Sequence, residues 1–392
     1  MRTLREGDRG STVELLQWGL GRAGVDTAAD GIFGPATAAA VKRWQEKSGL
    51  DADGVAGART WASLYPYLAG IRAVSVREGD TFNILAATYG TTPEAIAVAN
   101  PLALPGRLVP GETLRVPLGP SEVPTNISWS SDLLRHVVEG LRGRYPFLVV
   151  SVLGSSVLGR PLYQLTIGRG RIRVGYNAAH HANEWITTPV LLRFLEQYAY
   201  GVAFGGNVGG ADFRSLYAHY TLDIVPMVNP DGVDVVTGGL AEDSPPYLQA
   251  MEIAAGFPRI PFPDGWKANI DGTDVNLSYP AGWEIAKRLK YAQGFDRPAP
   301  RDFVRPAPLS APEAAAMVRR TTQAGYRLIL AYHTQGRIIY WKYDGYDPAG
   351  AYALARRMGA VSGYSVETTP DYSGHAGYKD WFIKTYNRPG YT

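Results

Sequence analysis

Three side chains in this sequence could together hold one metal ion. His181 and Glu184 lie three residues apart, directly after an apolar run that leads to Ala179. An imidazole and a carboxylate at this spacing can bind the same ion, and a catalytic zinc usually takes three protein ligands and keeps a fourth position for water. His333 is the candidate third ligand because it directly follows the apolar run 328–332. His/Glu/His ligation favours zinc, so the pattern predicts one Zn²⁺ ion at these residues.

The competing interpretation of each histidine is a local hydrogen bond without a metal. His-x-x-Glu alone favours that interpretation, since a chain with six histidines easily produces a chance match. The positions of His181 and His333 favour the metal, because α/β proteins place ligands at the carboxyl ends of strands. Three other histidines are not expected to be ligands: His136 lies in a helical pattern, His219 precedes a strand pattern and His375 lies in a glycine-rich loop.

Composition limits the classes of function. With 392 residues, 45% hydrophobic and 19% charged, the chain is long enough for two or three folded domains. It contains no cysteine, which excludes disulfides and a cysteine nucleophile and leaves His, Asp or Glu to hold any metal. A formal net charge of +3 is too small to indicate nucleic-acid binding. We find no run of membrane-spanning length, and the N-terminal residues do not resemble a signal peptide.

Residues 1–70 contain a repeated turn. The segments 29–37 and 52–60 each begin with Ala-Asp-Gly and reach a second glycine a few residues later. Asp-Gly favours a tight turn, and a following Pro or Thr favours helix entry. Apolar residues at helical spacing in 13–20 and 40–45 predict short helices joined by these turns, three in all. The pattern alone fits a helical unit of any purpose. With its Gly-x-Arg-Gly opening, it resembles the peptidoglycan-binding domain of bacterial wall hydrolases.

Residues 71–119 have a different pattern. An apolar strand enters a Glu-Gly-Asp-Thr turn, in which Asp80 or Thr81 can cap the next helix. A second short helix is predicted at 93–100 and a returning strand at 108–117. This β-α-α-β order, with its Pro-Gly-x-x-Leu-x-Val-Pro ending, resembles a LysM module. The resemblance implies binding to glycans that contain N-acetylglucosamine.

Residues 120–392 are predicted to form the largest domain. A Pro-containing polar segment at 119–125 suits a linker, and helical and strand patterns alternate beyond it. Nearly continuous apolar strands are predicted at 147–152, 162–167, 172–176, 222–225 and 328–332. Such strands are buried on both faces, which predicts an α/β domain with a mostly buried mixed sheet flanked by helices. The chain is therefore predicted to be multidomain.

Motifs beyond residue 126 follow one another in the order of a known family. His181-x-x-Glu184 and the distant His333 have the pattern of its metal ligands. The segment 228–232 matches an Asn-Pro-Asp-Gly turn, and 266–277 matches an Arg-x-Asn-x-x-Gly-Val-Asp-x-Asn-Arg block. Together these motifs resemble the zinc carboxypeptidases, the carboxypeptidase A-like metallopeptidases. The resemblance implies a zinc-dependent peptidase with one catalytic ion.

Two positions of the 266–277 block depart from the family pattern. The arginine that pairs with a substrate's terminal carboxylate is Leu277 here, which implies weak recognition of a free C-terminus. Lys267 replaces the arginine that stabilises the developing oxyanion, and a lysine can do this less directionally. Asn276 remains to hydrogen-bond the substrate, and Gln335 is a further candidate substrate-binding residue.

The resemblance to the zinc carboxypeptidases also implies a lid residue and a general base. Tyr372 aligns with the family's mobile tyrosine, which implies a hydrogen bond to substrate; an exposed loop tyrosine is the alternative. The family's base is a glutamate in a Phe/Tyr-Thr-x-Glu strand, and Tyr391-Thr392 aligns with the start of that strand. The glutamate is thus expected two residues beyond Thr392, in a peptidase domain truncated at its C-terminal end. Loss of a general base typically costs about 10²–10⁴-fold, so a chain without this glutamate is expected to turn over substrate that much more slowly.

A peptidase domain with Lys267 and Leu277 at these positions, joined to two wall-binding modules, resembles the γ-D-glutamyl-diaminopimelate endopeptidase branch of the family. The predicted function is a zinc-dependent peptidoglycan hydrolase that cleaves the γ-D-glutamyl-diaminopimelate amide of stem peptides with metal-activated water. The alternatives are a non-catalytic wall-binding protein and a metallocarboxypeptidase acting on wall peptides. Expected partners are peptidoglycan glycan strands and stem peptides, in the bacterial envelope or outside the cell. Diaminopimelate carries its own charged groups, so a further basic or polar contact is expected, which the sequence does not identify.

Overall fold

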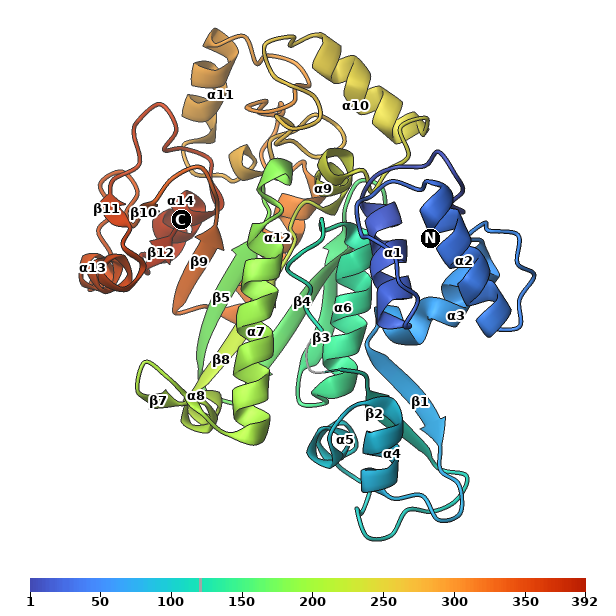
Figure 1. Ribbon diagram of the computed structural model, residues 1–392. Coiled ribbons are helices and arrows are strands. Elements are labelled where there is room, and N and C mark those ends of the chain that lie inside the picture. The colour runs from blue at the N-terminus through green and yellow to red at the C-terminus, as the bar shows by residue number, and fades with distance from the viewer. Residues whose placement is uncertain (120–121) are drawn as a thin grey trace. The chain divides into compact units, whose positions relative to one another are not determined.

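The computed structural model describes residues 1–119 and 122–392, which form two compact units. Unit 1 contains residues 1–150, 193–206 and 237–239, and unit 2 contains residues 151–192, 207–236 and 240–392. Figure 1 shows the order of the elements along the chain by colour. Two residues of the predicted linker, Pro120 and Ser121, lie outside the described residues. The predicted domain bounds 1–70, 71–119 and 120–392 stay predictions.

Unit 1 begins with the three predicted helices, α1 (Ser11–Arg22), α2 (Pro35–Lys47) and α3 (Ala58–Leu68). Both copies of the repeated turn have the same hydrogen bonds. Gln17 Nε2 donates to Asp30 Oδ1 over 2.8 Å, and Gln45 Nε2 donates to Asp53 Oδ1 over 2.8 Å. Each glutamine Oε1 also accepts from the glycine N–H of its own turn over 2.9 Å. The buried glutamines therefore fix the two turns between the helices.

The next elements are β1 (Ile71–Ser75), α4 (Phe82–Tyr89), α5 (Pro93–Ala99) and β2 (Thr113–Pro117). β1 and β2 pair in an antiparallel manner, so the predicted β-α-α-β order is confirmed. Thr81 caps α4, because its side chain accepts from the Ile84 N–H over 3.2 Å. Phe82 and Leu85 of α4 pack with Leu114 of β2 in a small core of their own.

The rest of unit 1 contains α6 (Ser131–Arg144) and the second part of α7 (Thr187–Phe204). Glu122, within the predicted linker, is only 1% exposed. Its carboxylate lies 3.4 Å from Arg22 Nη1 and 3.4 Å from Arg144 Nε. Burial raises the pKa of Glu122 to about 7 against the opposing effect of the two guanidinium groups. This part of the linker segment is thus packed into unit 1.

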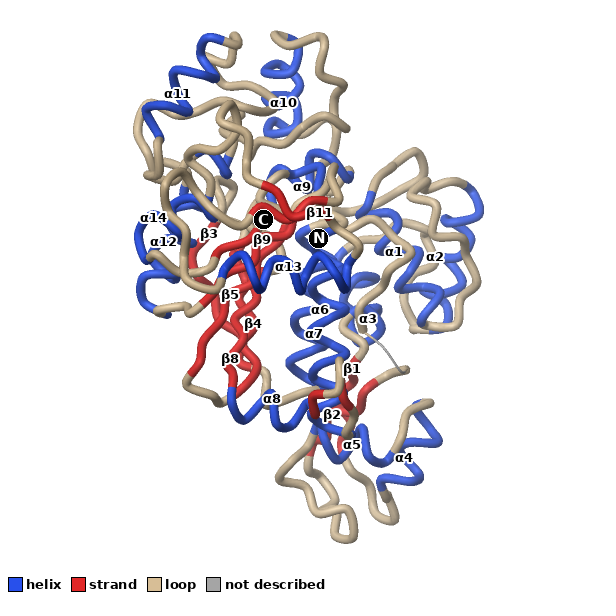
Figure 2. Tube along the Cα trace, turned by 90° about the vertical axis from the view of Figure 1, so that its left-hand side faces the viewer, coloured by secondary structure: helices blue, strands red, loops and turns tan. Residues whose placement is uncertain are grey.

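A six-stranded mixed sheet positions the candidate site. Its order is β12-β9-β5-β8-β4-β3, and it appears as the red strands in the middle of Figure 2. β5 pairs in parallel with both β9 and β8, β12 pairs in parallel with β9, and β4 is antiparallel to β8. The strands are β3 (Val149–Ser155), β4 (Pro161–Gly168), β5 (Ile172–Ala178), β8 (Tyr220–Val225), β9 (Leu328–Tyr332) and β12 (Gly390–Tyr391).

α12 (Pro312–Ala324) and α14 (Tyr378–Tyr386) lie on one side of this sheet (Figure 2). Met317 of α12 and Phe382 of α14 share a buried cluster with Ile329 of β9. The predicted α/β architecture with a mixed sheet flanked by helices is therefore confirmed.

Shorter elements complete the described chain: the 3₁₀ helices η1 (Ala182–Glu184) and η2 (Val275–Leu277), strands β6 (Asn207–Val208), β7 (Ala211–Asp212), β10 (Ile338–Tyr340) and β11 (Ser365–Glu367), and helices α8 (Phe213–His219), α9 (Pro230–Thr237), α10 (Pro245–Ala255), α11 (Trp283–Ala292) and α13 (Ala351–Ser362). Within the described residues, no helix combines the length and the apolar character that crossing a membrane requires.

Candidate metal centre

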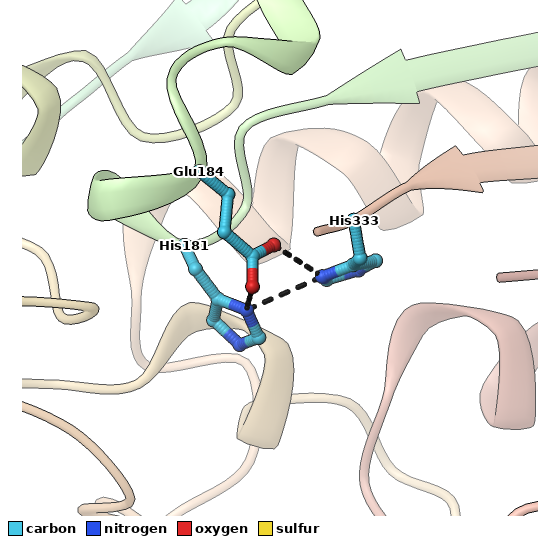
Figure 3. A group of neighbouring side chains, drawn as sticks. All are labelled: His181, Glu184 and His333. Carbon is cyan, nitrogen blue, oxygen red and sulfur yellow. Dashed lines mark hydrogen bonds and ion pairs between the residues drawn. The ribbon is translucent and has the colours of Figure 1, made fainter. Parts of the chain in front are cut away.

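The carboxyl ends of β5 and β9 bring the predicted metal ligands together. The two strands are parallel neighbours, and Ala178 at the end of β5 pairs with Tyr332 at the end of β9. His181 and Glu184 follow β5 in and beside η1, and His333 directly follows β9. Figure 3 shows the three side chains converging, with their ligand atoms within 4.8 Å of one another.

The donor atoms have the spacing of a zinc site. His181 Nδ1 lies 3.1 Å from Glu184 Oε1 and 3.2 Å from His333 Nδ1. His333 Nδ1 lies 2.8 Å from Glu184 Oε2. A tetrahedral zinc ion with bonds of about 2.0–2.1 Å separates its ligand atoms by about 3.3 Å. The two histidine nitrogens lie 3.2 Å apart and 2.8–3.1 Å from one or other Glu184 oxygen, so the three side chains are close enough to share one zinc ion.

The electrostatics of the cluster also suit a cation. Two imidazole nitrogens 3.2 Å apart repel each other unless a proton or a metal ion lies between them. The Glu184 side chain is only 2% exposed, so its charge requires a positive partner. Burial lowers the pKa of His181, but the charges of Glu184 and Asp274 outweigh burial and raise it to about 9. A metal ion that binds here therefore displaces a proton.

Asp274 supports the cluster, and the sequence analysis did not identify it. Its Oδ1 lies 3.4 Å from His181 Nε2, the ring nitrogen that does not face Glu184. A carboxylate in this place fixes the orientation and tautomer of the imidazole, which leaves Nδ1 for a metal. Backbone N–H groups of Asn276 and Asp302 each donate to the Asp274 carboxylate over 3.1 Å and hold it in place.

A left-handed turn at Ala179 leads from β5 to the ligands. Ala179 has a φ of 51°, a conformation that costs energy for a residue with a Cβ and is often found at functional sites. Its N–H donates to Thr187 Oγ1 over 3.0 Å, and Thr187 Oγ1 donates to the Glu184 carbonyl over 2.7 Å. Thr187 thus joins both ends of the segment that carries His181 and Glu184.

The Asn-Pro-Asp-Gly turn holds two site segments together. Asn229 is fully buried, and its Nδ2 donates to the carbonyls of His180, Lys267 and Ala268 over 3.3, 3.4 and 3.0 Å. The Ala182 N–H also donates to the Lys267 carbonyl over 3.1 Å. The position of Lys267 relative to the metal ligands is therefore fixed by buried backbone contacts.

Lys267 and Gln335 lie beside the cluster. Lys267 is 7% exposed, and its Nζ lies 3.4 Å from Glu184 Oε1 and donates to Gln335 Oε1 over 3.0 Å. Gln335 has a φ of 73° at the turn after His333, a second left-handed residue at this site. A buried ammonium here can stabilise negative charge that develops next to the donor set.

The other residues predicted to contact a substrate are Asn276, Leu277 and Tyr372. The Asn276 Oδ1 accepts from the Tyr378 N–H over 3.1 Å, which connects η2 to the start of α14. Leu277 is 8% exposed and packs with Trp283 and Ala376 in an apolar cluster. Tyr372 is 64% exposed in the loop before α14. Their roles toward a substrate stay predictions.

The other histidines are not part of the donor set. His180 is fully buried, and its Nε2 lies 2.9 Å from Tyr279 Oη. Burial, reinforced by the charges of His333 and His181, holds the pKa of His180 well below its usual value. Neither His219 nor His375 belongs to the metal-capable group found among the described residues, and the same holds for His136.

Family comparisons agree with this geometry. Residues 134–387 match the zinc carboxypeptidase family, a zinc-dependent family of peptidases. Residues 9–64 match a peptidoglycan-binding domain, and residues 74–117 match the LysM domain.

Two curated relatives have substantial identity. The chain is 40% identical over 268 residues to γ-D-glutamyl-L-diamino acid endopeptidase 1 of Lysinibacillus sphaericus, covering 68% of this chain and 65% of that protein. It is 37% identical over 250 residues to the uncharacterized protein YqgT of Bacillus subtilis, covering 63% of this chain and 65% of that protein. The matched region thus spans just under two thirds of the length of each relative.

A solved structure shows the same fold at low identity. Carboxypeptidase A from Helicoverpa armigera superposes with a TM-score of 0.51 and 19% identity, covering 69% of this chain and 64% of that chain. The match to the family covers more than half of the sequence and includes all three donor residues. The chain belongs to the zinc carboxypeptidase family.

Proposed function

We propose that this protein is a zinc-dependent peptidoglycan hydrolase that cleaves the γ-D-glutamyl-diaminopimelate amide of stem peptides. His181, Glu184 and His333 are the proposed zinc ligands, and Lys267 is the proposed oxyanion-stabilising residue. The relative from Lysinibacillus sphaericus, named as a γ-D-glutamyl-L-diamino acid endopeptidase, supports this substrate class.

The observation that carries the proposal is the burial of Leu277. An aliphatic side chain packed against Trp283 and Ala376 offers no donor for a substrate's terminal carboxylate. A peptidase that removes C-terminal residues needs such a donor at its binding site. The geometry at Leu277 therefore favours cleavage at an internal amide over release of a terminal residue.

Each proposed residue has a role that follows from its position. When bound, zinc polarises the scissile carbonyl and lowers the pKa of water. Asp274 keeps the His181 ring oriented for binding the metal, over the 3.4 Å contact described above. Lys267, held by Gln335, supplies positive charge where the carbonyl oxygen becomes negative.

We also propose that the two N-terminal modules bind peptidoglycan glycan strands in the cell envelope or outside the cell. The matches to a peptidoglycan-binding domain and to LysM support this partner. Two modules on one chain raise the effective concentration of stem peptides at the peptidase domain, so each can bind weakly.

Incubation of the zinc-loaded protein with purified muropeptides tests the peptidase. We expect mass spectrometry to detect L-Ala-D-Glu fragments from L-Ala-γ-D-Glu-diaminopimelate peptides that carry a further residue after diaminopimelate. Release of only that last residue would identify a carboxypeptidase and contradict the proposal drawn from Leu277. Sedimentation with intact sacculi but no cleavage would leave a wall-binding protein.

A further inference from the structure

Residues 299–303 form a short segment of unit 2 whose backbone contacts two residues of the site. The Pro300 carbonyl accepts from the Lys267 N–H over 2.7 Å. The Phe303 carbonyl accepts from the Asp274 N–H over 3.1 Å, and Phe303 is only 6% exposed. We call residues 299–303 the bracing segment, because its main chain is bonded to both Lys267 and Asp274.

Within the bracing segment, Asp302 contacts the carboxylate that supports His181. The Asp302 N–H donates to Asp274 Oδ2 over 3.1 Å. The other oxygen of Asp274, Oδ1, lies 3.4 Å from His181 Nε2 and accepts from the Asn276 N–H over 3.1 Å. Each oxygen of Asp274 therefore has its own backbone donor, and the two donors together hold the carboxylate in one orientation. A displaced Asp302 N–H would free Oδ2 and let Oδ1 turn away from His181.

The backbone of Asp302 is left-handed. Its φ is 64°, a region that is strained for a residue with a Cβ and open to glycine. Strained residues of this kind persist only where the surrounding structure holds them, and they gather at functional sites. Because φ is the rotation about the N–Cα bond, relaxation to a negative φ would change the direction of the Asp302 N–H relative to the rest of the segment. The contact with Asp274 thus depends on keeping this conformation.

Two cations hold the side chain of Asp302. Lys290 Nζ lies 2.6 Å from Oδ1, and Arg301 Nε donates to Oδ2 over 2.7 Å. The Lys290 and Asp302 side chains are only 11% and 15% exposed, so loss of either partner leaves a largely buried charge. Charge-assisted contacts on both oxygens therefore oppose relaxation of the backbone at Asp302.

The last turn of α11 is a firm support for this ion pair. Lys290 lies in that turn, and its neighbour Tyr291 donates from Oη to the Val304 carbonyl over 3.1 Å. The ring of Tyr291 also stacks on that of Phe303, with 6.4 Å between centroids and 9° between planes. An ion pair, a hydrogen bond and a ring contact thus join α11 to the bracing segment and the residue after it.

We propose that Asp302 is a positioning residue of the metal centre: its side chain, paired with Lys290, keeps the backbone that holds Asp274 against His181. Neither Asp302 nor Lys290 belongs to the metal-capable group found among the described residues, so both act through other residues. The inference rests on the proposed zinc ligands and extends their support as far as α11. It requires zinc affinity to depend on two side chains that do not bind the ion.

Two substitutions test the backbone at position 302, and neither measurement needs turnover. Asp302→Ala removes the carboxylate and keeps a Cβ at a φ of 64°, so zinc should bind about tenfold more weakly in competition with a chromogenic chelator. Asp302→Gly adopts this φ without strain and keeps the N–H, so it should bind zinc at least about threefold more tightly than the alanine variant. Wild-type affinity in Asp302→Ala would overturn the proposal, and so would a glycine variant as weak as the alanine one.

Lys290→Met tests the ion pair. This variant keeps most of the side chain's length, removes the ammonium and should bind zinc about threefold or more less tightly. Combined with Asp302→Ala it should cause no further loss, because both substitutions remove the same contact. Losses that add would refute the part of Lys290. Asp296→Ala is the matched control, since Asp296 pairs with Arg297 at 57% exposure between α11 and the bracing segment, and its zinc affinity should equal that of the wild type.

Cobalt substitution separates positioning from a general loss of stability. Co²⁺ in place of zinc has visible absorption bands that depend on the geometry of its ligands. With the site fully loaded, these bands should change in Asp302→Ala and return toward the wild-type spectrum in Asp302→Gly. An alanine variant that is less stable in urea but has wild-type bands and wild-type zinc affinity would refute the positioning role.

His181→Ala distinguishes failure of this inference from failure of the proposed zinc site. Loss of zinc in His181→Ala, with unchanged affinity in Asp302→Ala and Lys290→Met, would uphold the zinc site and refute the role of Asp302. A full zinc equivalent retained in His181→Ala would refute the proposed ligands and this inference with them. We expect loss of zinc in His181→Ala and the smaller, graded losses in the Asp302 and Lys290 variants.

Discussion

His181 Nε2 lies 3.4 Å from Asp274 Oδ1, while Nδ1 of the same ring faces Glu184 and His333. One imidazole therefore joins the donor set to a carboxylate behind it. Asp274→Asn removes the charge and keeps one acceptor oxygen, which can serve only one of the Asn276 and Asp302 N–H groups, since these donate to Oδ1 and Oδ2 respectively. We expect this variant to bind zinc about 10–100-fold more weakly, measured by competition with a chromogenic chelator.

The matched control for this measurement is Asp271→Asn. Asp271 lies in the same segment, but its Oδ2 pairs with Arg305 Nη2 over 2.8 Å at a partly exposed position. Zinc affinity should not change in this variant. The same affinity in Asp274→Asn and wild type would mean that His181 is oriented by its other contacts.

Lys267 should affect turnover far more than metal binding. Its Nζ lies beside the donor set and is held by Gln335 over 3.0 Å. Lys267→Met removes the ammonium and keeps much of the buried side chain's length. If the proposed peptidase function is correct, kcat should fall about 10²–10³-fold while the zinc content stays at one equivalent. Metal analysis and peptide kinetics on the same preparation check both parts, and Lys384→Met, at an exposed position in the last turn of α14, is the control.

An unchanged kcat in Lys267→Met would remove Lys267 from the reaction. Loss of zinc in this variant would assign it a different role, namely support of Glu184, whose Oε1 lies 3.4 Å from Nζ.

The sequence alone predicted that the three donor residues lie close together, because strand patterns show which residues lie at the ends of strands. His181 and His333 each follow an apolar strand, and neighbouring parallel strands end at the same edge. Asp274 could not be identified in this way, since its role depends on which nitrogen of His181 faces it. Asp274 belongs to the 266–277 block that resembles the family. The sequence nevertheless offers no geometric reason to select this residue from the block.

Other features depend on tertiary contacts that periodicity does not encode. Glu122 lies in a polar segment typical of a linker, yet its carboxylate is buried and contacts two arginines distant in sequence. The segments 342–344 and 368–375 line one cavity in unit 2, and no sequence period predicts the loop conformation that brings them together. Such loop-to-loop contacts require the fold before they can be seen.

Asn229 should be important for stability as well as for the site. Asn229→Ala removes this buried donor from the carbonyls of His180 and Ala268, while the Lys267 carbonyl keeps its hydrogen bond from the Ala182 N–H. We expect the free energy of unfolding to fall by roughly 2–4 kcal/mol, because buried polar groups left unpaired keep their desolvation cost. Urea denaturation measures the change. Asn207→Ala, at an exposed position in β6, should change it by less than about 0.5 kcal/mol.

A buried acid on α12 gives unit 2 a pH-dependent stability. Glu313 is fully buried, and its carboxylate accepts from Asn269 Nδ2 over 3.3 Å and from the Val157 N–H over 3.4 Å. Burial raises the pKa of Glu313 from 4.5 to about 7. The folded state therefore binds this proton more tightly than the unfolded state does. Its stabilising contribution is complete below pH 4.5 and is lost as the pH rises through about 7.

Glu313→Gln tests this directly, because glutamine is neutral at every pH and similar in shape. Relative to the wild type, the variant should become more stable by about 2–3 kcal/mol as the pH rises from 4.5 to above 7. Urea denaturation of both proteins at matched pH values measures the difference, and proton binding at the metal ligands cancels because both proteins share it. Parallel pH profiles for the two proteins would show that the Glu313 carboxyl ionises in the folded state at its ordinary pKa, with Asn269 and the Val157 N–H sufficient to hold its charge.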